Sequence, residues 1–332
     1  MRALLSHAPG GPETLRLGEM PDPVPGPGEL LVRVRACAIN YPDVLIIEDK
    51  YQLKPPRPFA PGSEIAGQVE AIGEGVQGWS PGDRLIAATG YGGLVEKVVI
   101  KAGAAIPLPA ERSFEEGSAL LLTYATSIHA LLDRGRLQVG QTLLVLGAAG
   151  GVGIAAVEIG KAVGARVIAA ASSEEKAAAA RKAGADDTIV YPSGPFDKDG
   201  LKALSQAFKD AVGAEGANVI FDPVGGDYSE AALRSIAWEG RFLVVGFPAG
   251  IAKLPLNLTL LKSCDVCGVF WGAFAGREPK ANAAHVEQLF RWWSEGRITP
   301  QVSAVYPLER AGEAIAALRD RRAIGKLVVT LD

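Results

Sequence analysis

The sequence predicts an α/β protein in which a doubly wound parallel sheet is joined to a mostly β domain. Three observations lead to this expectation. The first 120 or so residues place short β-type runs between many prolines and glycines, whereas candidate strands and helices alternate from about Ser118 onward. A glycine-rich turn at 147–153 separates a buried strand from a helix. With 332 residues, the chain is long enough for two domains.

The amino-terminal part is expected to be a small antiparallel β domain. The runs 30–36 and 64–72 are rich in apolar and β-branched residues and are bounded by prolines and glycines, as strands of such domains are. We therefore assign residues 1–122 to the first part of this domain.

The middle of the chain alternates strands with helices in the order of a doubly wound parallel sheet. We assign residues 123–265 to this second domain. The expected strands are 142–147, 166–170, 187–191, 218–222, 240–246 and 266–270, and the expected helices between them are 151–163, 174–183, 201–212, 227–238 and 256–263.

The carboxy-terminal part is expected to return to the first domain and complete it. Residues 266–332 are assigned to this return segment. It is expected to hold a helix near 281–296, a strand near 302–306, a helix over 308–320 and a final strand over 326–330.

The glycine turn is the strongest functional signal in the chain. Four apolar residues precede it, and the helix that follows would direct its positive end at a phosphate. Gly150 lets the backbone approach a dinucleotide pyrophosphate, with Gly151 and Val152 beside it, and Gly153 lets the helix lie close to its strand. Ala148 occupies the place of the first glycine of the strict G-x-G-x-x-G pattern, so a glycine turn without a ligand is the alternative.

Composition argues against several classes of partner and compartment. The net charge is −3, and no basic cluster is interleaved with aromatic residues, so neither nucleic acid nor a membrane is expected as a partner. The first residues turn polar too early for a secretory signal, which makes a cytoplasmic protein the simplest expectation. Cys264 and Cys267 have CxxC spacing, but without a second pair they are better interpreted as buried thiols than as zinc ligands.

A series of short motifs in matching order carries a family resemblance over nearly the whole chain. The sequence resembles the zinc-free medium-chain dehydrogenases/reductases of the NADPH:quinone oxidoreductase type. The motifs are Asn40-Tyr41-Pro42-Asp43, 61–67, 73–76, 81–84, 92–96, the turn at 147–153, Gly184-Ala185-Asp186, 221–226 and 325–329.

This resemblance implies a specific architecture. A GroES-like catalytic domain is divided between the two ends of the chain, and a Rossmann domain that binds the cofactor is inserted between them. The nicotinamide would meet its substrate in a cleft between the domains. Such proteins usually form homodimers through the edge strand of the cofactor sheet, here the strand near 266–270.

No metal ion is expected. By resemblance, the positions of the zinc ligands in zinc-dependent relatives correspond to Asn40, Ser63 and the 123–126 region, and 85–101 contains no cysteine. The three histidines are scattered singly along the chain, and a metal site needs several ligands together.

The residues after the second strand of the Rossmann domain favour NADPH over NADH. Ala171 stands where an acidic residue would bind the ribose of NAD, and Ser172, Ser173 and Lys176 can interact with an extra phosphate. The acidic pair at 174–175 weakens this interpretation unless it lies on a solvated helix start. The resemblance implies that Tyr191 and Arg322 also lie around the adenosine phosphate. The remaining predicted cofactor contacts are Gly246, Phe247, Phe270 and Lys326.

Three side chains are predicted to line the reaction site. Asn40 can donate through its amide, and Thr126 falls in the segment that approaches the nicotinamide. Tyr51 matches by position the proton-donating tyrosine of related enoyl reductases, although it could instead pack beside the prolines at 55–56. Leu45 replaces a tyrosine that many quinone reductases of this type carry, which makes the pocket less polar.

A site that has hydrogen-bond donors but no metal ion polarises a substrate carbonyl only modestly. It therefore suits substrates that accept a hydride readily. The predicted function is therefore NADPH-dependent reduction of a quinone. The alternatives are reduction of the C=C bond of an α,β-unsaturated carbonyl or enoyl thioester, and an NADPH-binding protein with vestigial activity.

Overall fold

The computed structural model describes residues 1–331, and the contacts divide them into two compact units. Unit 1 combines Met1–Leu122 with the segment from Pro300 to the end of the described chain. Unit 2 is Thr123–Thr299. The first and last parts of the sequence therefore build one unit, and the middle builds the other.

Unit 2 is built on a six-stranded parallel sheet with the order β10-β9-β8-β11-β12-β13. This order confirms the doubly wound fold, since the chain moves outward from the centre first in one direction and then in the other. The strands are β8 (Thr142–Val145), β9 (Arg166–Ala171), β10 (Asp187–Val190), β11 (Ala217–Asp222), β12 (Ile236–Val244) and β13 (Asp265–Gly268).

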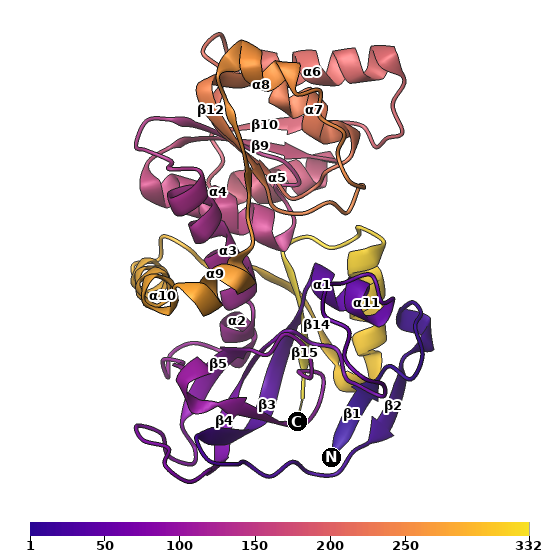
Figure 1. Ribbon diagram of the computed structural model, residues 1–332, viewed down its shortest axis with the longest axis vertical. Coiled ribbons are helices and arrows are strands. Elements are labelled where there is room, and N and C mark those ends of the chain that lie inside the picture. Colours follow the sequence, from indigo (N-terminus) through magenta and orange to yellow (C-terminus); the bar gives the residue numbers. More distant parts are fainter. Residues whose placement is uncertain (332) are drawn as a thin grey trace. The chain divides into compact units, whose positions relative to one another are not determined.

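Helices connect successive strands of this sheet and cover it (Figure 1). They are α4 (Gly151–Val163), α5 (Glu174–Lys182), α6 (Lys198–Val212), α7 (Asp227–Leu233) and α8 (Asn257–Lys262). The helix α6 is the most clearly amphipathic, and it buries Leu204 and Phe208 while its charged residues stay exposed. Asp197 accepts a hydrogen bond from the Gly200 amide (2.7 Å), which explains why α6 begins earlier than the expected residue 201.

Further helices come before β8 and after β13 along the chain. Before β8 the chain forms the π-helical stretch η3 (Leu121–Ala125), the short helix α3 (Thr126–Ile128) and the π-helical stretch η4 (His129–Arg134). After β13 it forms α9 (Trp271–Arg277) and α10 (Pro279–Ser294).

The return to unit 1 lies at Pro300, whereas the sequence placed it at residue 266. The physical reason is that β13 pairs with β12 from Asp265 onward and α10 buries Leu289 and Trp293. Residues 266–299 therefore belong to unit 2.

Unit 1 contains a seven-stranded, mostly antiparallel sheet and a two-stranded one. The long strand β3 (Glu29–Ile39) pairs with three neighbours, of which β15 (Lys326–Thr330) comes from the other end of the sequence. The remaining strands are β1 (Arg2–Leu5), β2 (Arg16–Glu19), β4 (Glu64–Ile72), β5 (Arg84–Ala88), β6 (Lys97–Lys101), β7 (Ile106–Pro107) and β14 (Val302–Pro307). This arrangement confirms that the GroES-like part is assembled from both ends of the chain.

Three short α-helices and three 3₁₀ turns complete unit 1, and α1 packs against α11 (Figure 1). They are α1 (Tyr41–Ile47), α2 (Phe114–Ser118), α11 (Ala311–Arg319), η1 (Pro12–Thr14), η2 (Ala102–Ala104) and η5 (Leu308–Arg310).

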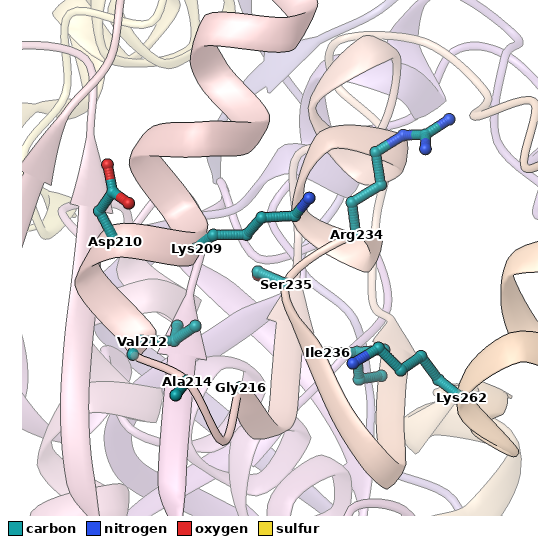
Figure 2. Close-up of a pocket in the computed structure, with 10 residues that line it drawn as sticks. Lys209, Asp210, Val212, Ala214, Gly216, Arg234, Ser235, Ile236 and Lys262 are labelled. Atoms are coloured by element: carbon teal, nitrogen blue, oxygen red, sulfur yellow. The ribbon is translucent and has the colours of Figure 1, made fainter.

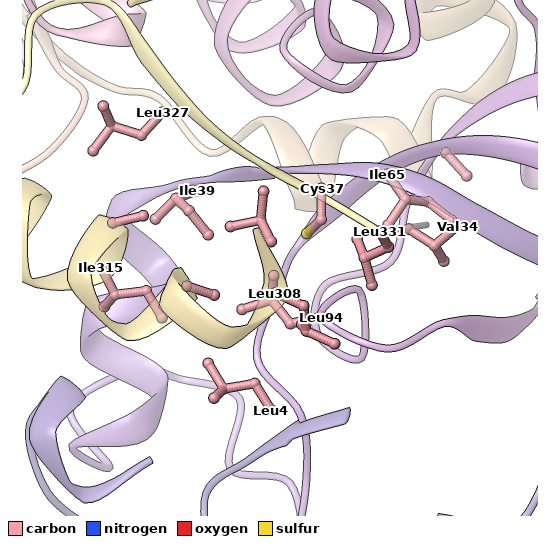
Figure 3. Close-up of a cluster of buried hydrophobic side chains, with 14 of the residues drawn as sticks. Leu4, Val34, Cys37, Ile39, Ile65, Leu94, Leu308, Ile315, Leu327 and Leu331 are labelled. Carbon is pink, nitrogen blue, oxygen red and sulfur yellow. The ribbon is translucent and has the colours of Figure 1, made fainter. Parts of the chain in front are cut away.

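The core of unit 1 joins side chains from distant parts of the sequence (Figure 3). Cys37 and Ile65 come from adjacent strands, and Leu308, Ile315 and Leu327 come from the carboxy-terminal segment. Burying these apolar side chains removes them from water and is the main stabilising contribution to the unit. Across residues 1–331, no helix has both the length and the apolar character needed to span a bilayer.

Candidate functional site

The glycine turn of unit 2 lies at the carboxyl end of β8, where ligands of parallel sheets bind. Gly150 is the N-cap of α4 and has extended backbone angles. Because glycine has no side chain, the first amides of the helix have no side-chain cap. Gly147 adopts a positive φ of 55°, which starts the turn. The turn therefore presents backbone N–H groups and the positive end of a 13-residue helix to an anion.

Gly150 and Gly153 have different surroundings. A Cβ on Gly153 would lie 2.3 Å from the Gly147 carbonyl oxygen, so the fold itself requires a glycine there. A Cβ on Gly150 would meet only that same oxygen, at an ordinary contact distance of 3.4 Å. The protein thus leaves space beside Gly150, and a bound pyrophosphate would fit this open side of the turn.

The end of β9 carries the polar side chains that the sequence assigned to a phosphate. Ala171 is buried, and the next residue, Ser172, is exposed. The Lys176 ammonium lies 3.5 Å from the Ser172 hydroxyl. Ser173 caps α5 by accepting the Lys176 amide at 3.3 Å. The structure therefore brings Ser172, Ser173 and Lys176 together around the first turn of α5.

Asp222 organises the loops that follow β11 and β12. Its buried carboxylate accepts the amides of Val224 (2.8 Å) and Gly225 (2.9 Å), and its backbone oxygen accepts that of Gly246 (3.3 Å). Burial raises the pKa of Asp222, although the Ser229 hydroxyl and the Gly225 and Val224 amides that donate to its carboxylate act to lower it. The predicted contact Phe247 follows Gly246 in this loop and is half exposed.

Two other predicted cofactor contacts differ in their exposure. Tyr191 is buried, and its ring packs against Phe208 and Tyr228 at centroid distances of 6.3 and 5.1 Å. Phe270 is 59% exposed at the start of α9. Tyr191 therefore contributes to the core of unit 2, whereas Phe270 leaves most of its ring open to contact.

Thr126 also belongs to unit 2, where it begins α3. It is half-buried, while its neighbours from Thr123 to Leu131 are buried. The hydroxyl of the adjacent Ser127 donates to the Val152 carbonyl (3.1 Å) in the first turn of α4. Thr126 is thus tied to the same helix that carries the glycine turn.

The unit 1 residues Asn40 and Lys326 meet in a buried polar network. Lys326 Nζ donates to Glu64 Oε1 (2.7 Å), Asn40 Oδ1 (2.6 Å) and the Ile39 carbonyl (3.2 Å). Asn40 Nδ2 in turn lies 2.9 Å from Glu64 Oε1 and 3.2 Å from the Ala38 carbonyl. An ammonium has three N–H donors, and Lys326 uses all of them inside unit 1. A contact with a cofactor would replace one of these bonds.

Asp43 and Tyr51 adjoin this network. Burial raises the pKa of Asp43 to about 6, although the Asn40 and Gly62 amides that donate to its carboxylate act to lower it. Burial and the nearby Asp43 charge also raise the pKa of the half-buried Tyr51. The Tyr51 phenol therefore keeps its proton at neutral pH and can act as a hydrogen-bond donor.

Arg322 is exposed on unit 1 and forms an ion pair with Asp320 at 3.3 Å. The predicted site residues of unit 1 are Asn40, Tyr51, Arg322 and Lys326. The other predicted residues lie in unit 2.

Metal ligands are not grouped anywhere in residues 1–331. Within this range, no three His, Cys, Asp or Glu side chains are arranged to hold a metal ion. Asn40 and Ser63, which the resemblance matched to zinc-ligand positions of zinc-dependent relatives, are hydrogen-bonded to each other at 3.3 Å.

A basic pocket of 440 Å³ lies beside the amino end of β12 in unit 2 (Figure 2). Lys209, Arg234 and Lys262 surround it at the carboxyl ends of α6, α7 and α8, and β12 begins there. Basic side chains at these positions stabilise the negative ends of helices. Because ligands of parallel sheets bind at the carboxyl ends of the strands, this pocket is separate from the candidate cofactor site.

Sequence reasoning missed the buried acids Glu64, Glu158 and Asp222. Glu158 and Asp222 lie in otherwise apolar runs, and a carboxylate there signals a buried partner. This signal was present in the sequence, but it did not identify the partners.

Two family models match the chain, one in each unit. The alcohol dehydrogenase GroES-like domain matches residues 26–110, and the zinc-binding dehydrogenase model matches residues 151–287. The second description names zinc, whereas residues 1–331 contain no group of three His, Cys, Asp or Glu side chains that could hold a metal ion.

The chain is also similar to individual proteins over almost its full length. It is 37% identical over 308 residues to the quinone oxidoreductase-like protein 2 homolog of Nematostella vectensis, covering 92% of this chain and 82% of that protein. It is 30% identical to a quinone oxidoreductase of Rattus norvegicus, covering 100% and 98%. The structure of Escherichia coli quinone oxidoreductase complexed with NADPH superposes with a TM-score of 0.90 at 28% identity, covering all of both chains.

Proposed function

Because the chain belongs to the quinone oxidoreductase family of medium-chain dehydrogenases/reductases, we propose that it is an oxidoreductase that reduces a quinone with NADPH and without a metal ion. The glycine turn with its open side at Gly150 is the observation that carries this proposal. When bound, NADPH supplies a hydride from its nicotinamide. The chain's own residues bind the cofactor and place the acceptor.

The polar groups at the end of β9 support the assignment of NADPH as the hydride donor. A 2′-phosphate adds negative charge, and the Lys176 ammonium beside the Ser172 hydroxyl suits that charge. Buried Ala171 adds no negative charge of its own. The related Escherichia coli quinone oxidoreductase was solved with NADPH, which agrees with this choice.

The acceptor side is proposed to depend on Tyr51 and Thr126, with Asn40 as a positioning residue. Both amide hydrogens of Asn40 have acceptors inside unit 1, so we assign it to holding the buried network rather than to contact with the acceptor. Tyr51 keeps a donatable proton. A quinone that receives a hydride becomes a hydroquinone monoanion, which takes one proton from solvent or from a side chain to become the hydroquinone.

Reduction of a conjugated C=C bond is the second candidate, and the protonated Tyr51 favours it. Hydride addition at the β-carbon leaves an enolate, which a phenol can stabilise by hydrogen bonding and then protonate. A quinone depends less on one proton donor, because its hydroquinone anion is a weaker base than an enolate.

Turnover with NADPH against a panel of ortho- and para-quinones, enones and short enoyl-CoA esters tests the acceptor. We expect the highest kcat/KM with a quinone, and Tyr51→Phe is expected to reduce enone turnover much more than quinone turnover. Preference for enones would favour the second candidate, and equal small losses on both classes would remove Tyr51 as the proton donor. NADPH binding without turnover of any acceptor would indicate a vestigial enzyme.

We also propose that the protein forms a homodimer through β13. This strand ends the unit 2 sheet, and Val266 on it is 41% exposed. The neighbouring helix α8 exposes Leu260 and Leu261 as well. A second copy that pairs with this strand would satisfy its free edge and cover apolar surface.

A further inference from the structure

The segment that carries Thr126 is anchored on both sides. Thr126 is the half-buried residue in the buried stretch from Thr123 to Leu131. Tyr124 lies two residues before it and Ser127 one residue after it. Each of these two neighbours uses its hydroxyl to bind the helix α4.

The first anchor is a buried hydrogen bond between Tyr124 and Glu158. The phenol donates to Glu158 Oε2 at 2.7 Å, and both side chains are almost fully removed from solvent. Burial and then the Glu158 charge raise the pKa of Tyr124, so the phenol stays protonated and remains the donor. A hydrogen bond to a charged acceptor in a buried place is among the stronger ones in a protein.

Glu158 also holds the end of unit 2. The same oxygen, Oε2, accepts the Thr299 amide at 3.0 Å, immediately before the chain leaves unit 2 at Pro300. Tyr124 is the second residue of that unit, which begins at Thr123. One carboxylate on α4 therefore fixes both the entering and the leaving segments of unit 2.

The second anchor is Ser127. Its hydroxyl donates to the Val152 carbonyl at 3.1 Å, and Val152 lies in the first turn of α4. The Thr126 segment is therefore hydrogen-bonded to α4 at two places, at Val152 beside the glycine turn and at Glu158.

We propose that Tyr124, Glu158 and Ser127 are positioning residues that hold Thr126 in a fixed register with the glycine turn of the cofactor site. This inference rests on the proposed function, in which Thr126 helps to place the acceptor. All three residues act within unit 2, because every hydrogen bond involved lies inside it.

The kinetic consequence follows from the geometry that hydride transfer needs. The reacting atoms must come within about 3–3.5 Å of each other, and a small misplacement lowers the rate strongly. Loosening Thr126 should therefore lower kcat. Cofactor affinity should change little, because Tyr124 and Ser127 are not among the residues proposed to hold the dinucleotide.

A double-mutant cycle tests the proposal with purified full-length protein, NADPH and the best quinone of the panel. We expect Tyr124→Phe to lower kcat about tenfold, equal to 1.4 kcal/mol in the barrier, with the KM for NADPH within twofold of wild type. Thr126→Val should lower kcat as well. In the Thr126→Val background, Tyr124→Phe should then cause little further loss, because the group that it positions is gone.

The kinetic isotope effect supplies a readout that a purely structural role would not move. With NADPH deuterated at the transferred position, Tyr124→Phe should make the primary isotope effect more dependent on temperature than in wild type. Ser127→Ala removes the second anchor with a smaller change in volume and should act in the same direction. Ser205→Ala is the matched control, because it removes a buried hydroxyl that bonds within α6 to the Leu201 carbonyl.

Additive losses of kcat in the cycle would overturn the proposal, as would an unaltered kcat in Thr126→Val. A Ser205→Ala variant that matches Ser127→Ala in kcat and isotope effect would overturn it too. In all these cases the wild type still turns over, so the proposed function survives. Wild-type protein that reduces none of the acceptors with NADPH would overturn the proposed function and this inference with it.

Discussion

Gly150 and Gly153 lie three residues apart in one turn, and the structure gives them different tasks. The Gly153 position is filled by the backbone of the turn, whereas the Gly150 position has room for a methyl group. Gly150 also has a φ of −75°, which any residue adopts. Packing therefore accounts for Gly153, and the proposed pyrophosphate accounts for Gly150.

Alanine substitutions at these two positions should separate folding from binding. Gly150→Ala is expected to leave the free energy of unfolding within about 1 kcal/mol of wild type, since its backbone angles suit alanine. It should raise the Kd of NADPH at least about tenfold, because the methyl group occupies the approach to the phosphates. Gly153→Ala should instead destabilise the fold by about 1–3 kcal/mol through overpacking.

Urea unfolding and NADPH fluorescence titration measure the two effects. Unaltered NADPH affinity in a folded Gly150→Ala variant would contradict the assignment of this turn.

At the scale of single residues, local spacing was sufficient to predict a site at the glycine turn and at the end of β9. It did not identify the partners of Asn40, since Glu64 and Lys326 are 24 and 286 residues away from it. Long-range pairs of this kind depend on the completed fold. A buried polar group must have a partner, but the sequence alone does not say which.

At the scale of elements, the alternation of strands and helices made the parallel sheet predictable. The boundaries of β12 were harder. The expected helix at 227–238 ends as α7 at Leu233, and Ile236 already pairs with Ala217. A positive φ of 57° at Glu239 and a register shift between Ala217 and Val219 show that this strand starts irregularly, which no periodic pattern would reveal. The helix α9 was also missed, because its seven residues are too few to show a helical period.

The edge strand β13 provides a test at the same scale. Val266→Lys places a charge on the exposed edge, so we expect it to shift a wild-type dimer toward monomer in sedimentation velocity experiments at micromolar protein. Val24→Lys is the matched control, because Val24 is 85% exposed and belongs to unit 1, not to the sheet that contains β13. A monomeric wild type, or a Val266→Lys variant that stays dimeric, would contradict the proposed interface.

At the scale of the whole molecule, the chain builds one unit from its two ends and another from its middle. The resemblance predicted this division, and the pairing of β15 with β3 confirms it. The predicted position at which the chain returns to unit 1, residue 266, was wrong. The sequence contains no linker there, and β13, α9 and α10 follow each other without a break in pattern. The identity of the acceptor was not predictable, since a site of hydrogen-bond donors suits several conjugated carbonyl compounds.

The central claim is that this chain is a reductase that takes its hydride from NADPH, and one comparison tests it most directly. The kcat/KM values for NADPH and NADH are measured with the same quinone in wild type and in Lys176→Ala. We expect wild type to prefer NADPH by at least about tenfold, and Lys176→Ala to lose about 10- to 100-fold with NADPH but little with NADH, as the loss of a charge-assisted hydrogen bond to the 2′-phosphate requires. Equal or better turnover with NADH, or an unchanged preference in the variant, would contradict the account.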